Sequence, residues 1–95
     1  MDEPSQLDFL SALGEEFSAV LRPVLGTDVD PHDAYEVFVE ALGTDFGPAC
    51  LLFLSDAQVD QLRTATAAWL ESDAVTETHI RSIIRRTLSR WPPGE

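Results

Sequence analysis

The chain has 95 residues, of which 44% are hydrophobic and 24% charged, which is typical of one packed domain and excludes an intrinsically disordered protein. No apolar run approaches the roughly 18 residues that a transmembrane helix needs. The start MDEPSQ is acidic, unlike a signal peptide, and the single cysteine cannot form an internal disulfide. We therefore expect a cytoplasmic protein with no membrane partner.

Charge is the most informative bulk property of the chain. Seventeen acidic residues face six basic ones, all of them arginine, which gives a formal net charge of −11. Residues 1–80 hold sixteen of the acids and two arginines, whereas residues 81–95 hold four arginines and one glutamate. The acidic part should repel nucleic acid and attract basic partners. The absence of lysine excludes lysine-dependent chemistry, and the arginine bias is typical of a small bacterial or phage protein.

The first predicted helix runs from about Ser5 to Arg22. Its apolar residues recur at steps of three and four, the period of one helix face; they are Leu10, Leu13, Phe17, Leu21 and Val24. Acidic residues are expected on the opposite, solvated side, namely Asp8, Glu15 and Glu16. Pro23 leaves the last turn open, because proline removes a backbone hydrogen bond.

The stretch DVDPHDAYE, residues 28–36, starts the second predicted helix, which runs from Pro31 to just before Gly43. Asp30 is the expected N-cap, and Pro31 suits the first helical position because it has no amide to leave unpaired. Asp33 places its charge at the positive end of the helix dipole.

The same stretch raises a metal-binding alternative, since His32 and Glu36 are four residues apart on one helix face. They would need Asp28 or Asp33 and a further ligand, and the chain has only one other histidine, His79. A calcium loop starting at Asp28 lacks the glycine and the glutamate required at its sixth and twelfth positions. Capping accounts for more of these residues, so we expect no metal and no cofactor.

The apolar segment GPACLLFL, residues 47–54, is predicted as a buried two-turn helix. A strand is the alternative, although a lone strand would have nothing to pair with. Cys50 has apolar neighbours, which indicates a buried structural cysteine rather than a nucleophile. Since no nucleophile motif and no glycine-rich phosphate loop accompany it, we expect no enzymatic activity and no small-molecule substrate.

Two further helices are predicted in the second half of the chain. Ser55 and Gln58 have the spacing of a capping box, and Thr76 is a good N-cap for the last helix. One face of the earlier helix carries Val59, Leu62, Thr66, Trp69 and Leu70. The last helix has a narrow apolar stripe that comprises Ile80, Ile83, Ile84, Leu88 and Trp91.

These segments predict an all-α fold, a compact bundle of four to five short helices with no β-sheet. We expect a single helical domain over residues 1–95, with frayed ends at about 1–4 and 92–95.

The sequence favours a non-catalytic adaptor or regulatory module that acts by contact with another protein. Such a module would bury a helix face on its partner or on its own copy, at an apolar groove with charged rims. Alternatively, the acidic surface neutralises a basic partner, as immunity proteins, antitoxins and DNA mimics do. A third interpretation is a helix–turn–helix DNA binder that uses residues 76–91. The acidic body and a turn without glycine count against nucleic acid as the partner.

Two sets of residues are the candidate binding surfaces. An acidic strip suited to a basic partner comprises Asp33, Glu36 and Glu40. A basic face suited to a protein or a nucleic acid comprises Arg81, Arg85, Arg86 and Arg90. These arginines could instead pair with acids of neighbouring helices. Given the net charge, a homodimer would require an apolar or an arginine–acid interface.

Overall fold

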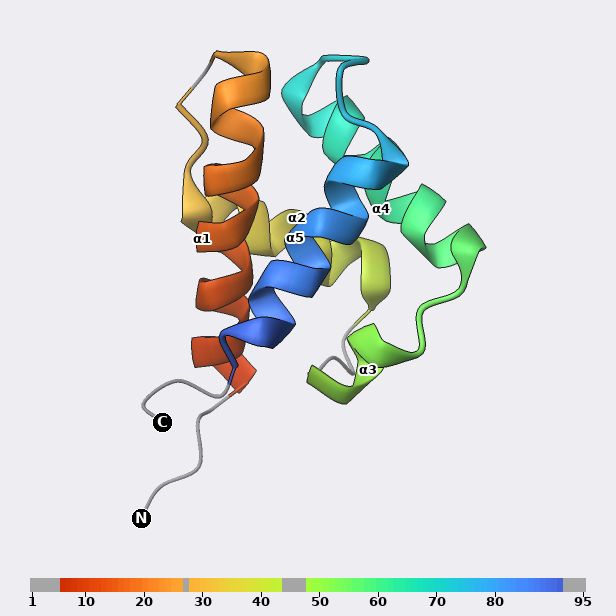
Figure 1. Ribbon diagram of the computed structural model, residues 1–95. Helices are drawn as coiled ribbons and strands as arrows, with labels where there is room; N and C mark the ends of the chain where they lie inside the picture. The colour runs from red at the N-terminus through yellow and green to blue at the C-terminus, as the bar shows by residue number, and fades with distance from the viewer. Residues whose placement is uncertain (1–5, 27, 44–47, 92–95) are drawn as a thin grey trace.

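Five α-helices make up the described part of the chain, residues 6–26, 28–43 and 48–91 of the computed structural model (Figure 1). They are α1 (Gln6–Leu25), α2 (Pro31–Leu42), α3 (Pro48–Leu52), α4 (Asp56–Leu70) and α5 (Glu77–Ser89). No strand occurs among these residues, which confirms the predicted all-α bundle and excludes the strand alternative for residues 48–54. The predicted frayed ends at 1–4 and 92–95 lie outside the described residues.

The four longer helices surround one apolar core. Helices α1 and α4 each pack against both α2 and α5. As a result α2 and α5 lie on opposite sides of the bundle, and Figure 1 shows α5 in front of α2. Phe17 lies centrally, with its ring edge-on to Phe38 at 5.2 Å and tilted against Trp69 at 5.5 Å between ring centroids. Other fully buried core residues are Phe9, Leu13, Leu21, Leu62, Ile80 and Ile83.

The predicted helix starts are confirmed by their capping hydrogen bonds. The amide of His32 donates to the Asp30 carboxylate at 2.9 Å. Ser55 and Gln58 form the complete capping box, each accepting from the backbone amide of the other. A second box at α5 was not predicted: the Thr76 amide donates to Nδ1 of His79 at 3.1 Å, and the His79 amide donates to the Thr76 hydroxyl.

Helix α1 is longer than predicted, because it continues through Pro23 to Leu25. Pro23 and Ala19 are both exposed, so water can satisfy the Ala19 carbonyl that loses its amide partner. Val24 is 44% exposed and Leu25 packs against the core in its place. Neither α1 nor any other described helix is both long and apolar enough to cross a membrane.

Helices α1 and α2 approach each other closely at Gly14. A Cβ atom on Gly14 would lie 2.3 Å from the carbonyl oxygen of Pro31, at the first residue of α2. Nearby, the buried Ser18 hydroxyl lies 2.8 Å from the Val29 carbonyl oxygen and 3.1 Å from that of Gly14. The missing side chain and the hydroxyl together hold the chain before α2 against α1.

We expect Gly14→Ala to lower the free energy of unfolding by about 2 kcal/mol, because the new methyl group meets backbone that cannot rotate away. This net loss already includes the gain of about 1 kcal/mol in the free energy of unfolding that the higher helix propensity of alanine brings. Urea denaturation measures the change. Ser11→Ala, at an exposed position of the same helix, is the control and should be nearly neutral; equal stability of the two variants would contradict the close approach.

Helix α4 ends in a Schellman motif built on an unusual residue. Glu71 has φ 53° and ψ 45°, the left-handed conformation that glycine adopts without strain. The Glu71 amide donates to the Ala68 carbonyl at 3.3 Å and the Ser72 amide to the Ala67 carbonyl at 3.0 Å. The turn before α5 therefore has the geometry of a glycine turn without the glycine.

Glu71→Gly should raise the free energy of unfolding by about 1 kcal/mol, since a non-glycine residue in this conformation costs about that much. Thermal or urea unfolding would show the gain. Asp73→Gly removes the same charge from the same turn at a residue with negative φ, and it should destabilise the protein slightly. A matching gain in both variants would mean that charge, not backbone conformation, is responsible.

Candidate functional site

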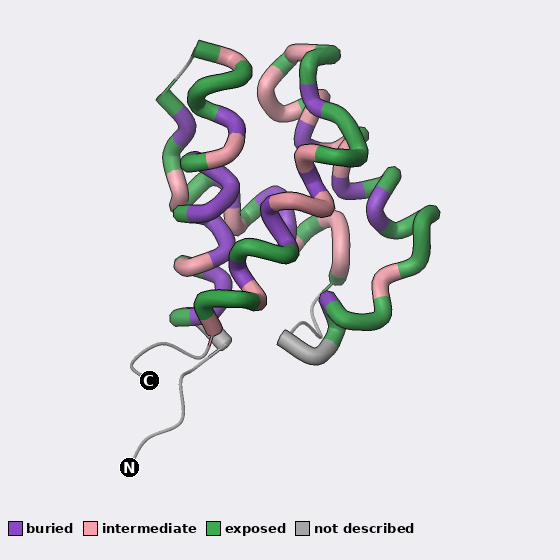
Figure 2. Tube along the Cα trace, in the orientation of Figure 1, coloured by how far each residue is buried: buried purple, intermediate pink, exposed green. Residues whose placement is uncertain are grey.

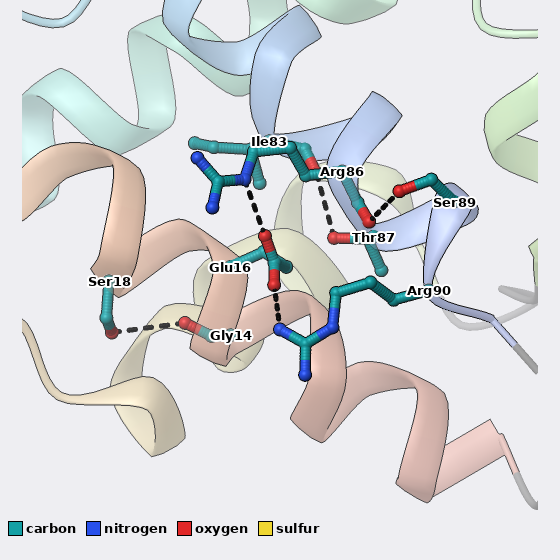
Figure 3. Close-up of polar contacts among 8 residues, drawn as sticks. All are labelled: Gly14, Glu16, Ser18, Ile83, Arg86, Thr87, Ser89 and Arg90. Carbon is teal, nitrogen blue, oxygen red and sulfur yellow. Dashed lines mark hydrogen bonds and ion pairs between the residues drawn. The ribbon is translucent and has the colours of Figure 1, made fainter. Parts of the chain in front are cut away.

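The basic face of α5 is held to α1 by a buried carboxylate. Glu16 exposes only 3% of its side chain. Nε of Arg86 donates to its Oε2 at 3.0 Å, and Nη1 of Arg90 donates to its Oε1, so both oxygens are paired (Figure 3). A carboxylate is costly to bury unless its charge is compensated. The two arginines supply that compensation, and we call these three residues the Glu16 clamp.

The clamp corrects the expectation that Glu16 lies on the solvated side of its helix. Glu16 lies three residues after Leu13 and seven after Phe9, and both of these are fully buried. It therefore shares their face of α1. The sequence carried a signal for this contact. Arg86 and Arg90 are four residues apart and therefore share one face of the last helix, so both can reach the same carboxylate.

A hollow of about 230 Å³ lies beside the clamp. Arg90 and Glu16 line it together with Asp8, Glu15 and Trp91. The Trp91 ring also contacts Phe9 edge-on, with 5.2 Å between ring centroids. The arginine and the buried carboxylate here are already engaged with each other, so this hollow belongs to the α1–α5 contact.

Arg81 is likewise held by carboxylates of the protein itself. Its Nε donates to Oε1 of Glu77 at 2.8 Å, one turn earlier on α5, and its Nη2 donates to Asp56 at the start of α4. Both carboxylates accept hydrogen bonds from the charged guanidinium, Glu77 with the larger effect, and they raise the pKa of Arg81 above its ordinary value. Arg81 therefore joins α5 to α4.

Arg85 differs from the other arginines. It is exposed and makes no ion pair with any residue that the structure describes. The two arginines that precede α5 also have acidic partners, since Arg22 lies 3.4 Å from Asp28 and Arg63 lies 2.8 Å from Asp60. Within the described residues, Arg85 is thus the one arginine left for an outside partner.

Arg85 lines an apolar groove of about 290 Å³, which we call the α3–α5 groove. Its apolar walls come from α3, the start of α4 and α5, and comprise Leu51, Leu52, Leu54, Val59, Ile84 and Leu88. Arg81 also lines it. Apolar walls with arginine among them are the composition of a protein interface, where arginine and large apolar residues are enriched.

The residues beside this groove are strongly exposed. Leu52 is 65% and Phe53 is 81% exposed, the highest values among the large apolar residues described. Figure 2 shows the chain from residue 50 to the start of α4 exposed over most of its length. The prediction of a buried two-turn helix is therefore wrong: α3 has five residues, only Leu51 of its described side chains is buried, and Cys50 is exposed. A single turn cannot bury apolar residues on all its sides.

The acidic strip lies on the opposite side of the bundle. Asp33, Glu36 and Glu40 are all exposed on α2 and line a hollow of about 370 Å³, which we call the α2–α4 hollow. Its apolar lining comprises Tyr35, Val37, Val39 and Trp69. The structure thus brings the three predicted acids together around aromatic and aliphatic side chains.

The four predicted arginines, by contrast, do not form one free basic surface. Arg86 and Arg90 serve the clamp, Arg81 bridges α4 and α5, and Arg85 faces the α3–α5 groove. Ion pairing with acids of neighbouring helices therefore accounts for three of the four.

His32 and Glu36, the pair considered as metal ligands, have contacts within the protein itself. Nε2 of His32 lies 3.9 Å from Oε1 of Glu36, and its ring contacts Tyr35 edge-on at 5.0 Å. Asp30 caps α2 and Asp28 lies beside Arg22. Across the described ranges, no group of three or more His, Cys, Asp or Glu residues is placed to hold a metal ion.

The chain matches no protein-family model, no curated protein and no solved structure, so the site is interpreted from its own geometry.

Glu16→Gln should lower the free energy of unfolding by about 2 kcal/mol, because it removes the charge from two charge-assisted hydrogen bonds while keeping the side-chain shape. The cost stays below that of a fully buried pair, since both arginines are more than half exposed to water. Urea denaturation measures it.

A double-mutant cycle with Arg86→Gln separates the pair from the single effects, and we expect a coupling of about 1 kcal/mol. Arg85→Gln is the matched control, since it removes an unpaired arginine from the same helix and should change stability by less than about 0.5 kcal/mol. Additive effects of Glu16→Gln and Arg86→Gln would contradict the clamp.

Proposed function

We propose that this chain is a small acidic helical adaptor or regulatory module that binds another protein through the α3–α5 groove and has no catalytic role. The observation that carries the proposal is the position of Arg85. The one arginine without an ion-pair partner among the described residues lines the same groove as Leu52, and Leu52 and the adjacent Phe53 are the most exposed large apolar residues described.

The physical basis is the free energy of removing apolar surface from water. Burial of apolar surface contributes about 25 cal/mol per Å², and Leu52 and Phe53 are adjacent side chains that do not receive this contribution within their own fold. A partner that covers them buries both at once. Arg85 then fixes the orientation of the partner. Its charge loses contact with water in the complex, so a carboxylate of the partner must lie next to it.

A second candidate function is neutralisation of a basic protein by the acidic strip. It is favoured by the exposure of Asp33, Glu36 and Glu40 around an apolar hollow, which would hold a cationic and partly apolar surface. DNA binding by residues 76–91 stays a prediction. Three of the four arginines in this segment already pair with carboxylates, which leaves little positive charge for phosphates.

The double variant Leu52→Ser/Phe53→Ser should weaken binding of the native partner by about 30-fold or more, since truncating a central interface side chain costs about 2 kcal/mol. Partners would be isolated from the native host with the wild-type chain, identified by mass spectrometry, and measured again as purified proteins by calorimetry.

Val24→Ser is the matched control, because Val24 is the other large apolar residue exposed in the described chain and lies on α1. It should bind as the wild type does. Binding that survives the Leu52/Phe53 variant, but collapses between low and moderate salt, would reject the groove and favour the acidic strip.

A further inference from the structure

Two surfaces of this chain differ in the sign of their charged groups. One is the α3–α5 groove, lined by Leu52 and by Arg85, which has no ion-pair partner among the described residues. Phe53 directly follows Leu52 in the chain, and 81% of its surface is exposed. The other is the α2–α4 hollow, an apolar depression bordered by carboxylates. One surface offers a projecting aromatic ring and a cation, and the other offers a recess and anions.

The recess suits an aromatic side chain. Tyr35 and Trp69 line it, so an entering phenyl ring would meet aromatic neighbours, which pack favourably edge to face. Glu36 and Glu40 lie one turn apart on α2, and Nε2 of His32 lies 3.9 Å from Oε1 of Glu36. A guanidinium arriving beside the ring would find two carboxylates.

The two surfaces lie on opposite sides of one molecule. α5, which carries Arg85, and α2, which carries the carboxylates, are separated by α1 and α4, with which each of them packs. A single chain cannot bring its own Arg85 into its own hollow while this packing holds. A second copy can, and each copy would still have one surface free.

We propose that the chain associates head to tail, with Phe53 and Arg85 of one copy docked in the α2–α4 hollow of the next. This inference rests on the proposed function, because it names a second copy as the partner of the α3–α5 groove. A contact between two different surfaces does not close on itself as a two-fold contact does, so it builds a ring or an open chain of copies.

The net negative charge of each copy opposes this assembly, and this repulsion helps to separate specific contacts from general charge effects. Copies with a charge of −11 each repel one another at a distance. Salt at about 0.15 M screens charges beyond about 8 Å, so the repulsion weakens while contacts at the interface persist. A variant with a smaller net negative charge repels its copies less than the wild type does. If such a variant loses association, the cause must be the loss of a specific contact.

The experiment compares three variants with the wild-type chain by sedimentation velocity at about 0.15 M salt over a wide concentration range. The groove variant is Phe53→Ser/Arg85→Ser. The hollow variant is Glu36→Lys/Glu40→Lys, which moves the net charge from −11 to −7. The control is Glu15→Lys/Asp73→Lys, which reaches the same net charge at two exposed positions outside both surfaces.

We expect the mass of the wild type and of the control to grow with concentration beyond that of two copies. Each of the other variants should stay monomeric at concentrations where the wild type associates. An equal mixture of the two should form pairs and stop there, because only the intact groove of one and the intact hollow of the other remain. Circular dichroism verifies that every variant is folded.

A wild type that stays monomeric throughout would overturn the inference, as would association that either variant leaves unchanged. Failure of the proposed function looks different. If the wild type is monomeric but a foreign partner is lost with Leu52→Ser/Phe53→Ser, the groove remains a binding site and only its occupant was wrong. If neither self-association nor any foreign partner depends on the groove, the proposed function fails as well.

Discussion

The buried carboxylate of Glu16 is the contact on which the rest of this structure depends. It lies at the middle of the first helix and pairs with two arginines of the last one, so it joins the two ends of the chain across the bundle. A buried anion is tolerated only while its partners are in place. The clamp therefore restricts how α5 can lie on α1: a helix rotated by one residue would leave Glu16 uncompensated. It also decides what the surface of α5 can offer, because Arg86 and Arg90 are engaged before any ligand arrives.

That restriction gives α5 two different sides. Toward α1 its arginines are internal structural groups, and toward α3 one arginine is left unpaired among the described residues, beside apolar walls. The shortness of α3 completes the arrangement, since five residues can bury Leu51 but leave Leu52 and the following Phe53 in water. Such a surface is costly for a protein that functions alone and useful for one that functions in contact with another. The strongly acidic composition then acts by limiting which surfaces can approach the groove.

Local patterns predicted the helices well, and they failed where a residue's environment depends on distant parts of the chain. Asp30, Ser55 and Thr76 cap their helices through neighbours at most three residues away, so the sequence around them was sufficient. Glu16 was placed on the wrong side of α1 because of its charge: its spacing from Leu13 and Phe9 indicates their buried face, but the arginines that compensate it there are about seventy residues away. The burial of Leu52 and Phe53 was overestimated for a related reason. Apolar composition says that a segment would gain from being covered, and it does not say whether another element reaches it.

By itself the sequence determined the class of fold, the helix starts, the acidic balance and the uneven distribution of arginine, since each depends on composition or on spacings of a few residues. The tertiary structure decided which charges cancel. It paired Arg81, Arg86 and Arg90 with acids of other helices, left Arg85 at an apolar groove, and gathered Asp33, Glu36 and Glu40 around a hollow on the opposite side. The physical reason is that ion pairing and burial depend on distances between helices far apart in the chain, and a helical period constrains only the face on which a residue lies.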